Sequence, residues 1–311
     1  MTEAVGDPMG AIRPVVPTPQ PHRSATLCRL CGNRLHDDLI SLDIDVHPNC
    51  EDNVALTIAQ PVTEPGTDHP MRTELIRIIK FRDSNSSRSL QAALGPSQIG
   101  GTCDRRLAMQ MAGVRRVNRQ SDPWPAIVGT AVHDWLERAL QRENQEWVKR
   151  NLQPPWLTER RVAADPLIVG TSDVYHIPSQ TVVDWKTMGD TTKSHLKKEG
   201  PGDPYKIQIQ TYGLGYLRAG FQVRKVGLMF LPRAGYLKDA LYYEWDFNPA
   251  IAQAAIERVY RVASNVHAMI QANPGVDIWS QVPCDKTALC GWCPFFLRGV
   301  ETASASGCSG S

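Results

Sequence analysis

Two aspartates and a lysine lie on two neighbouring predicted strands in the middle of the chain. Asp173 stands within a predicted strand over residues 167–177. Asp184 and Lys186 end the next predicted strand, residues 181–186, and project from the same face because they are two residues apart. A short turn makes the strands antiparallel neighbours, so the two carboxylates can converge. Two carboxylates with a lysine are typical of a Mg²⁺ or Mn²⁺ site that activates water and neutralises phosphate charge.

Helical spacing predicts further polar side chains in the same region. His133 and Glu137 are four residues apart, on one face of a helix predicted over residues 127–148. A neutral imidazole there would complete the metal shell, and a histidine packed within the helix is the alternative. Gln208 and Tyr212 are also four apart, on the helix predicted after the lysine. They would contact DNA or brace the lysine, and ordinary helix surface is the alternative.

The chain contains eight cysteines. In a reducing cytosol such residues are metal ligands or catalytic groups more often than disulfides. Two ligand pairs with two-residue gaps occur near the N-terminus, and such pairs deliver four S and N donors to one tetrahedral Zn²⁺. The sequence therefore predicts a zinc module over residues 27–59, with His36 as a weaker alternative ligand. The pairs are Cys28 with Cys31 and His47 with Cys50.

A second group of cysteines frames the folded region. Cys284, Cys290 and Cys293 lie near its end, and Cys103 upstream is the first candidate for a fourth ligand. Cys308 is the rival, but it stands in a tail rich in Ser, Ala and Gly that we expect to be unstructured. On spacing alone, an all-cysteine site suits an iron–sulfur cluster and zinc equally well.

Taken in order, these motifs resemble the RecB-like branch of the PD-(D/E)XK nucleases. The nearest resemblance is to its iron–sulfur type, which includes the CRISPR-associated Cas-four exonucleases, the AddB nuclease domain and phage proteins similar to them. It covers about residues 95–297. The motifs are Cys103, His133, Gly170-x-x-Asp173, Asp184-x-Lys186, Gln208-x-x-x-Tyr212 and the three cysteines at 284, 290 and 293.

The resemblance implies a role for each matching residue. Metal ligands would be His133, Asp173 and Asp184; Lys186 would be the catalytic lysine, and Gln208 and Tyr212 the family's additional motif. A [4Fe–4S] cluster joining the two ends of the domain would be held by Cys103, Cys284, Cys290 and Cys293. The implied activity is metal-dependent DNA degradation, commonly 5′ to 3′ on single strands.

Composition limits the classes of protein to consider. The 311 residues carry a formal net charge of only +2, which argues against non-specific wrapping of nucleic acid. No apolar run approaches the ~18 residues that span a bilayer, and the N-terminus lacks a signal pattern, so we expect a cytoplasmic protein, in the host cytoplasm if phage-encoded. No G-x-x-x-x-G-K-[ST] motif is present, so unwinding would come from a partner, such as a helicase or recombination protein.

The elements that must position these residues alternate between helix and strand. This pattern predicts a mixed α/β domain over residues 95–297, and the resemblance implies a restriction-endonuclease-like PD-(D/E)XK core with flanking helices. We expect a disordered leader at 1–26, a linker and helix at 60–94, and a disordered tail at 298–311. The predicted helices cover 97–112, 127–148, 204–218 and 249–271, and the strands 160–164, 167–177, 181–186, 223–231 and 240–247.

Together these features predict a Mg²⁺- or Mn²⁺-dependent exonuclease acting on single-stranded DNA or DNA ends in recombination, repair or replication. The alternative is a non-catalytic DNA-binding scaffold with zinc and iron–sulfur sites. Basic residues flanking the site would hold phosphates, and solvated surface charge is the other interpretation. They are Arg105, Arg106, Arg115, Arg116 and Arg119 on one side and Lys193, Lys197 and Lys198 on the other.

Overall fold

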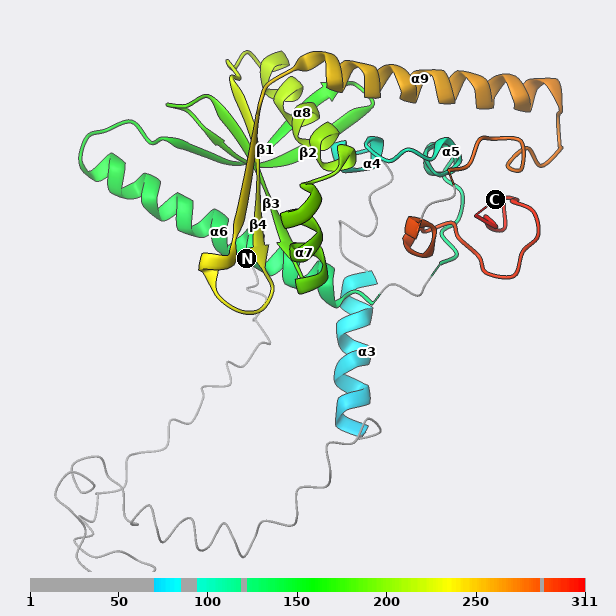
Figure 1. Cartoon of the computed structure of the whole chain (residues 1–311), viewed down its shortest axis with the longest axis horizontal. Coiled ribbons are helices and arrows are strands. Elements are labelled where there is room, and N and C mark those ends of the chain that lie inside the picture. Colours follow the sequence, from blue (N-terminus) through cyan, green and yellow to red (C-terminus); the bar gives the residue numbers. More distant parts are fainter. Residues whose placement is uncertain (1–69, 85–93, 119–121, 286–287, 311) are drawn as a thin grey trace, which may run out of the picture. The chain divides into compact units, whose positions relative to one another are not determined.

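The computed structural model describes residues 70–84, 94–118, 122–285 and 288–310 (Figure 1). The chain divides into two compact units, residues 1–75 and 76–311. The predicted leader and zinc module, including Cys28, Cys31, His47 and Cys50, lie outside the described residues. Within the predicted linker region, helix α3 spans Pro70–Ser84. None of the described helices combines the length and apolar character needed to cross a membrane.

Within the described residues, five strands form one mixed sheet in the order β1-β2-β3-β4-β5. Neighbouring strands are antiparallel except β3 and β4, which are parallel. A parallel pair needs a crossover connection, and helices α7 and α8 provide it. The predicted mixed α/β fold is therefore confirmed. The bounds are β1 Trp156–Asp165, β2 Ile168–His176, β3 Thr181–Met188, α7 Asp190–Glu199, α8 Asp203–Arg218, β4 Lys225–Pro232 and β5 Leu241–Asp246.

The remaining helices are α4 (Pro96–Ile99), α5 (Asp104–Met111), α6 (Trp124–Lys149) and α9 (Pro249–Ala272), with 3₁₀ turns at Leu237–Asp239 and Ala288–Trp292. The prediction of one helix over residues 97–112 is wrong, because residues 100–103 interrupt the helix between α4 and α5. At this break Gly100 lies against Pro204, and a Cβ there would be 2.6 Å from the carbonyl oxygen of Pro204. Helix α7 was not predicted, since its polar sequence buries only Leu196.

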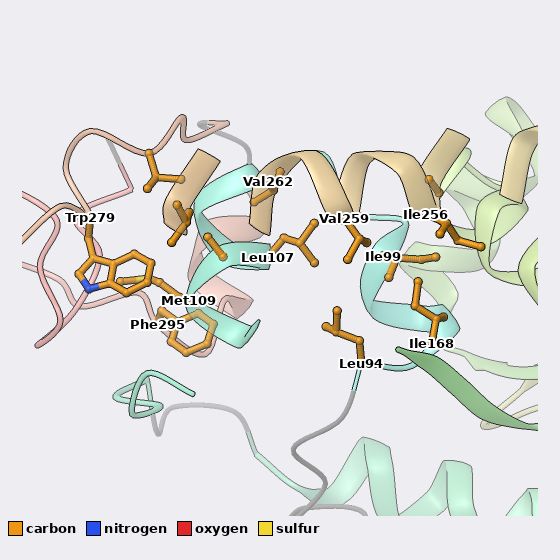
Figure 2. Close-up of a cluster of buried hydrophobic side chains, with 14 of the residues drawn as sticks. Leu94, Ile99, Leu107, Met109, Ile168, Ile256, Val259, Val262, Trp279 and Phe295 are labelled. Atoms are coloured by element: carbon orange, nitrogen blue, oxygen red, sulfur yellow. The ribbon is translucent and has the colours of Figure 1, made fainter. Parts of the chain in front are cut away.

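Two clusters of buried side chains form the core. One lies between α8 and the sheet and includes Val182, Tyr216 and Leu228. The other packs α9 against α4, α5 and the C-terminal residues, and Figure 2 shows Leu107, Met109, Trp279 and Phe295 at that end of it. The second cluster therefore joins the start of the folded domain to its end.

Strands β2 and β3 are paired only near the turn that joins them. Residues 174–176 pair with 181–183, and no further pairs follow between these two strands. Beyond this point β2 still pairs with β1, and β3 pairs with β4 along its whole length. The sheet consequently contains a fork between β2 and β3, and the predicted catalytic residues stand beside it.

The C-terminal segment differs from its prediction as a disordered tail. Phe296 forms a bridge with Cys308, and Ser304 forms one with Gly307. Ala303 and Cys308 are buried, at 4% and 6% exposure. Small residues here permit close turns, and the buried positions pack into the second core cluster, so the segment is ordered despite its composition.

Candidate active site

The fork between β2 and β3 is bridged by Asp173. A backbone N–H at Trp185 has no strand partner in β2, because the strands have already diverged. It donates instead to Oδ2 of Asp173, at 2.6 Å. Buried backbone donors need such partners. This unpaired N–H of β3 thus fixes the orientation of Asp173, a predicted metal ligand.

Asp184 is held from two directions. Its Oδ1 accepts a hydrogen bond from Nε2 of Gln208 on α8 at 3.2 Å, and its Oδ2 lies 2.5 Å from Nζ of Lys186. The aspartate is only 2% exposed. Burial raises the pKa of Asp184 above its ordinary value, although the ammonium of Lys186 opposes this shift. Asp184 and Lys186 lie together as their spacing predicts, and the expectation that Gln208 braces Lys186 becomes a bond from Gln208 to Asp184.

His133 reaches the same place from helix α6. Its Nδ1 lies 3.1 Å from Oδ1 of Asp173. Burial by itself lowers the pKa of His133, but the hydrogen bond to Asp173 and the negative charges of Asp173 and Asp184 raise it above the ordinary value. A histidine hydrogen-bonded to a ligand carboxylate suits a metal shell, where its neutral form binds.

Glu159 on β1 was missed by the sequence analysis. Ligand atoms of His133, Glu159 and Asp173 all lie within 4.8 Å of one another. Register places Thr158 opposite Val174 and Arg160 opposite Ser172, so Glu159 falls opposite Asp173. The predicted strand began one residue later, at 160. Extending it by one position and applying the antiparallel register would have found this glutamate.

The backbone at Glu159 is unusual. Its φ is 46°, in the left-handed region that non-glycine residues seldom adopt. Burial raises the pKa of Glu159 to about 7, and the negative charges of Asp173 and Glu137 add to the effect. A strained backbone and a group that resists ionisation together are common at functional sites.

The donor set fits a hard divalent ion. Three carboxylates and one imidazole offer the oxygen-rich ligands that Mg²⁺ and Mn²⁺ prefer. A cation there would also offset the negative charge that Asp184 places in a buried position. His133, Glu159 and Asp173, whose ligand atoms lie within 4.8 Å of one another, could hold the metal. Asp184, close enough for its charge to raise the pKa of His133, could join them.

Tyr212 has a packing contact in addition to its predicted place beside Gln208. A Cβ at Gly170 would be 3.1 Å from Cε1 of Tyr212 and 2.6 Å from Cδ of Pro96. Only glycine fits at this point of β2. Tyr212 and Pro96 therefore fix how closely α8 and α4 approach the strand that carries Asp173.

All five cysteines that the structure describes line one cavity of about 50 Å³. Sγ of Cys103 lies 3.9 Å from Sγ of Cys284. Burial and the neighbouring thiols raise the pKa of Cys284 to about 12. The four predicted ligands, Cys103, Cys284, Cys290 and Cys293, are brought together, and Cys308 lies with them. Clustered thiol ligands fit zinc or an iron–sulfur cluster.

The predicted basic surface is only partly available. Arg105 is 3% exposed and donates from Nε to the carbonyl of Val282 at 2.9 Å, so the prediction that it holds phosphates is wrong. Lys193 pairs with Asp239 at 3.3 Å. Arg106, Arg115, Arg116, Lys197 and Lys198 are exposed, and Arg119 lies outside the described residues.

Part of the chain aligns with solved structures of exonucleases. An alkaline exonuclease (LHK-Exo) from Laribacter hongkongensis aligns with a TM-score of 0.41 and 12% identity, over 58% of this chain and 91% of that one. Its complex with dAMP gives 0.40 and 14% over the same shares. A phage-related exonuclease from Haemophilus somnus 129PT gives 0.32 and 14%, over 58% of this chain and 96% of that one. No protein-family model and no curated protein matches the sequence.

Proposed function

We propose that the chain is a divalent-cation-dependent DNA exonuclease of the RecB-like PD-(D/E)XK type. The observation that carries this proposal is the meeting of five chemistry-bearing side chains at the fork in the sheet. They come from one helix and three strands, and gathering several partly buried ionisable groups is costly unless a bound ion compensates their charge. The residues are His133, Glu159, Asp173, Asp184 and Lys186.

A divalent ion bound by these carboxylates and the imidazole would lower the pKa of water, so that it could lose a proton and attack a phosphodiester. The ion would also offset charge on the phosphate. The protein's own groups do the positioning. Gln208 and the Trp185 N–H hold the two aspartates in place. Lys186, whose ammonium lies 2.5 Å from Asp184, would orient the attacking water and stabilise charge developing in the transition state.

The preference for single strands or DNA ends, and the 5′ to 3′ direction, come from the motif resemblance. The same resemblance supports a [4Fe–4S] cluster at Cys103, Cys284, Cys290 and Cys293. We further propose Zn²⁺ at Cys28, Cys31, His47 and Cys50, a helicase or recombination protein as partner, and a cytoplasmic location.

The test is degradation of linear DNA labelled at the 5′ or 3′ end, single- or double-stranded, with Mg²⁺, Mn²⁺ or EDTA. We expect activity only with a divalent ion and release of 5′-terminal nucleotides first. Asp184→Asn and Lys186→Met should each lower the rate by about 10²-fold or more, because each removes transition-state stabilisation of several kcal/mol.

Lys149→Met is the matched control, since Lys149 is exposed on α6 and pairs with Glu146 at 2.7 Å. It should retain the wild-type rate. DNA binding without cleavage in the wild-type protein would instead indicate the non-catalytic scaffold. Cleavage by Asp184→Asn within tenfold of wild type would contradict the assigned site.

A further inference from the structure

The C-terminal segment, residues 296–310, is held against the cysteine cavity by its own backbone. Cys308 N–H donates to the carbonyl of Phe295 at 2.7 Å, and Leu297 N–H donates to the carbonyl of Cys308 at 2.9 Å. The N–H of Ala305 donates to Asp277 at 2.8 Å. These hydrogen bonds give Cys308 a defined position in the cavity.

The sulfur of Cys308 has two donors directed at it. Nη1 of Arg105 lies 3.6 Å from Sγ, and the backbone N–H of Gly310 lies 3.4 Å from it. Cys308 belongs to the second core cluster, yet its sulfur also has these two polar contacts. A guanidinium and an amide N–H stabilise negative charge on sulfur, as they do around metal-bound thiolates.

Cys103, which lines the same cavity, has a related arrangement. It caps helix α5, and its Sγ accepts the N–H of Arg106 at 3.4 Å. Arg105, which contacts Cys308, is the second residue after Cys103, and its Nε donates to the carbonyl of Val282 at 2.9 Å. Cys103 and Cys308 line the same cavity, and each sulfur has a backbone N–H directed at it.

We propose that Cys308 is a ligand of the metal centre at this cavity, so that binding of a thiolate-preferring metal or iron–sulfur cluster fastens residues 304–310 to helix α5. The inference rests on the proposed metal centre and does not require nuclease activity. Five thiols line a site at which a cluster or zinc takes four ligands. Cys308 therefore replaces one of Cys284, Cys290 and Cys293 in the set proposed above, and Cys103 at the start of α5 stays a ligand.

The experiment compares the full-length wild-type protein with Cys308→Ser and Cys308→Ala, each purified without oxygen and reconstituted with ferrous iron and sulfide, or with Zn²⁺ alone. Iron, sulfide and zinc are counted per chain, and the visible spectrum is recorded. We expect both variants to lose at least four-fifths of the metal that wild type binds at this cavity. Ser306→Ala, exposed in the same segment, should load like wild type.

Two further measurements separate ligation from folding. After chelation, wild type and Cys308→Ser should have the same thermal midpoint, and reloading should raise the midpoint of wild type alone. Amide exchange at Leu297 and Cys308 should slow on loading only in wild type. Retention of wild-type metal content by Cys308→Ser, or failure of wild type to load at all, overturns the proposal. DNA cleavage is scored separately, so a nuclease-inactive protein with Cys308-dependent loading would contradict only the proposed function.

Discussion

Glu159 and Asp184 keep their protons to a higher pH than ordinary carboxyl groups do. Burial raises the pKa of Glu159 from 4.5 to about 7, with Asp173 adding to the shift, and burial also raises that of Asp184. Both groups must be ionised to bind a cation, so metal binding has to displace protons. Affinity for Mn²⁺ should therefore rise with pH as these carboxyl groups ionise.

The variant Glu159→Gln tests whether this glutamate causes the pH dependence of Mn²⁺ affinity. We expect wild type to bind Mn²⁺ more tightly at pH 8 than at pH 6, and Glu159→Gln to bind about tenfold more weakly at pH 8 with a smaller pH dependence. In the metal-free protein, the free energy of unfolding changes with pH in the opposite direction, because the raised pKa of Glu159 makes stability fall as the pH rises. A carboxyl group with a raised pKa stabilises the fold below pH 4.5, and this contribution is lost as the pH rises through about 7.

Calorimetric titration with Mn²⁺ at pH 6, 7 and 8 measures the first effect, and urea unfolding of the metal-free protein measures the second. Glu143→Gln on α6 serves as the control, since Glu143 is exposed and bonds Trp147 on its own helix. An unchanged pH dependence of Mn²⁺ binding in Glu159→Gln would remove this glutamate from the metal site.

The site residues that could be predicted from the sequence lie in regular strands, and those that could not depend on an irregular backbone or on tertiary packing. Asp173, Asp184 and Lys186 lie in strands with ordinary alternation, joined by a short turn, so their convergence followed from the pattern. Glu159 was missed because the predicted strand began at residue 160, and its positive φ is a further departure that regular alternation does not anticipate. Cys308 stands among small residues that usually indicate disorder, and tertiary packing orders them.

At the scale of elements, one arginine of α9 holds the loop that presents Cys103. Arg258 donates from Nε to Asp104 at 2.7 Å and from Nη2 to the carbonyl of Thr102 at 2.8 Å, and its Nη1 bonds the carbonyl of Gly101. This loop interrupts what sequence periodicity predicted as one helix. The glycines allow the break, and the arginine from a distant helix fixes its shape.

Arg258→Met keeps the length of the side chain and removes these donors. We expect the free energy of unfolding to fall by about 2–4 kcal/mol, because several charge-assisted hydrogen bonds to partly buried acceptors are lost. Urea denaturation of the metal-free protein measures it. Arg261→Met, exposed one turn along the same helix, should change stability by less than about 0.5 kcal/mol. Equal effects of the two variants would show that the hydrogen bonds of Arg258 contribute nothing specific to stability.

At the scale of the whole molecule, the cysteine site joins distant parts of the chain. Cys103 and Cys284 are 181 positions apart, yet their sulfurs lie 3.9 Å apart. A metal centre bound to both would close a long loop. By analogy with covalent cross-links, such closure stabilises the fold by about 3–5 kcal/mol, since it lowers the entropy of the unfolded chain.

Cys103→Ser tests this contribution with little disturbance of α5, because serine can also cap the helix. In the metal-loaded state we expect the variant to unfold about 3–5 kcal/mol more easily than wild type. After chelation the two proteins should be equally stable. Denaturant titrations of loaded and chelated samples make the comparison. A difference that persists after chelation would assign the loss to packing and not to the metal.

The fork in the sheet has a mechanical consequence. Strands β1 and β2 form one part of the sheet and β3 to β5 another, and only the pairs at 174–176 and 181–183 connect the two backbones directly. Asp173 lies on one side of this fork and Asp184 on the other, while helices α6 and α8 pack against both parts. An ion bound by both aspartates would add a further link across the fork. Ion binding and the spacing of the two parts would then be coupled, so a change that favours the ion-bound spacing would also raise the affinity for the ion.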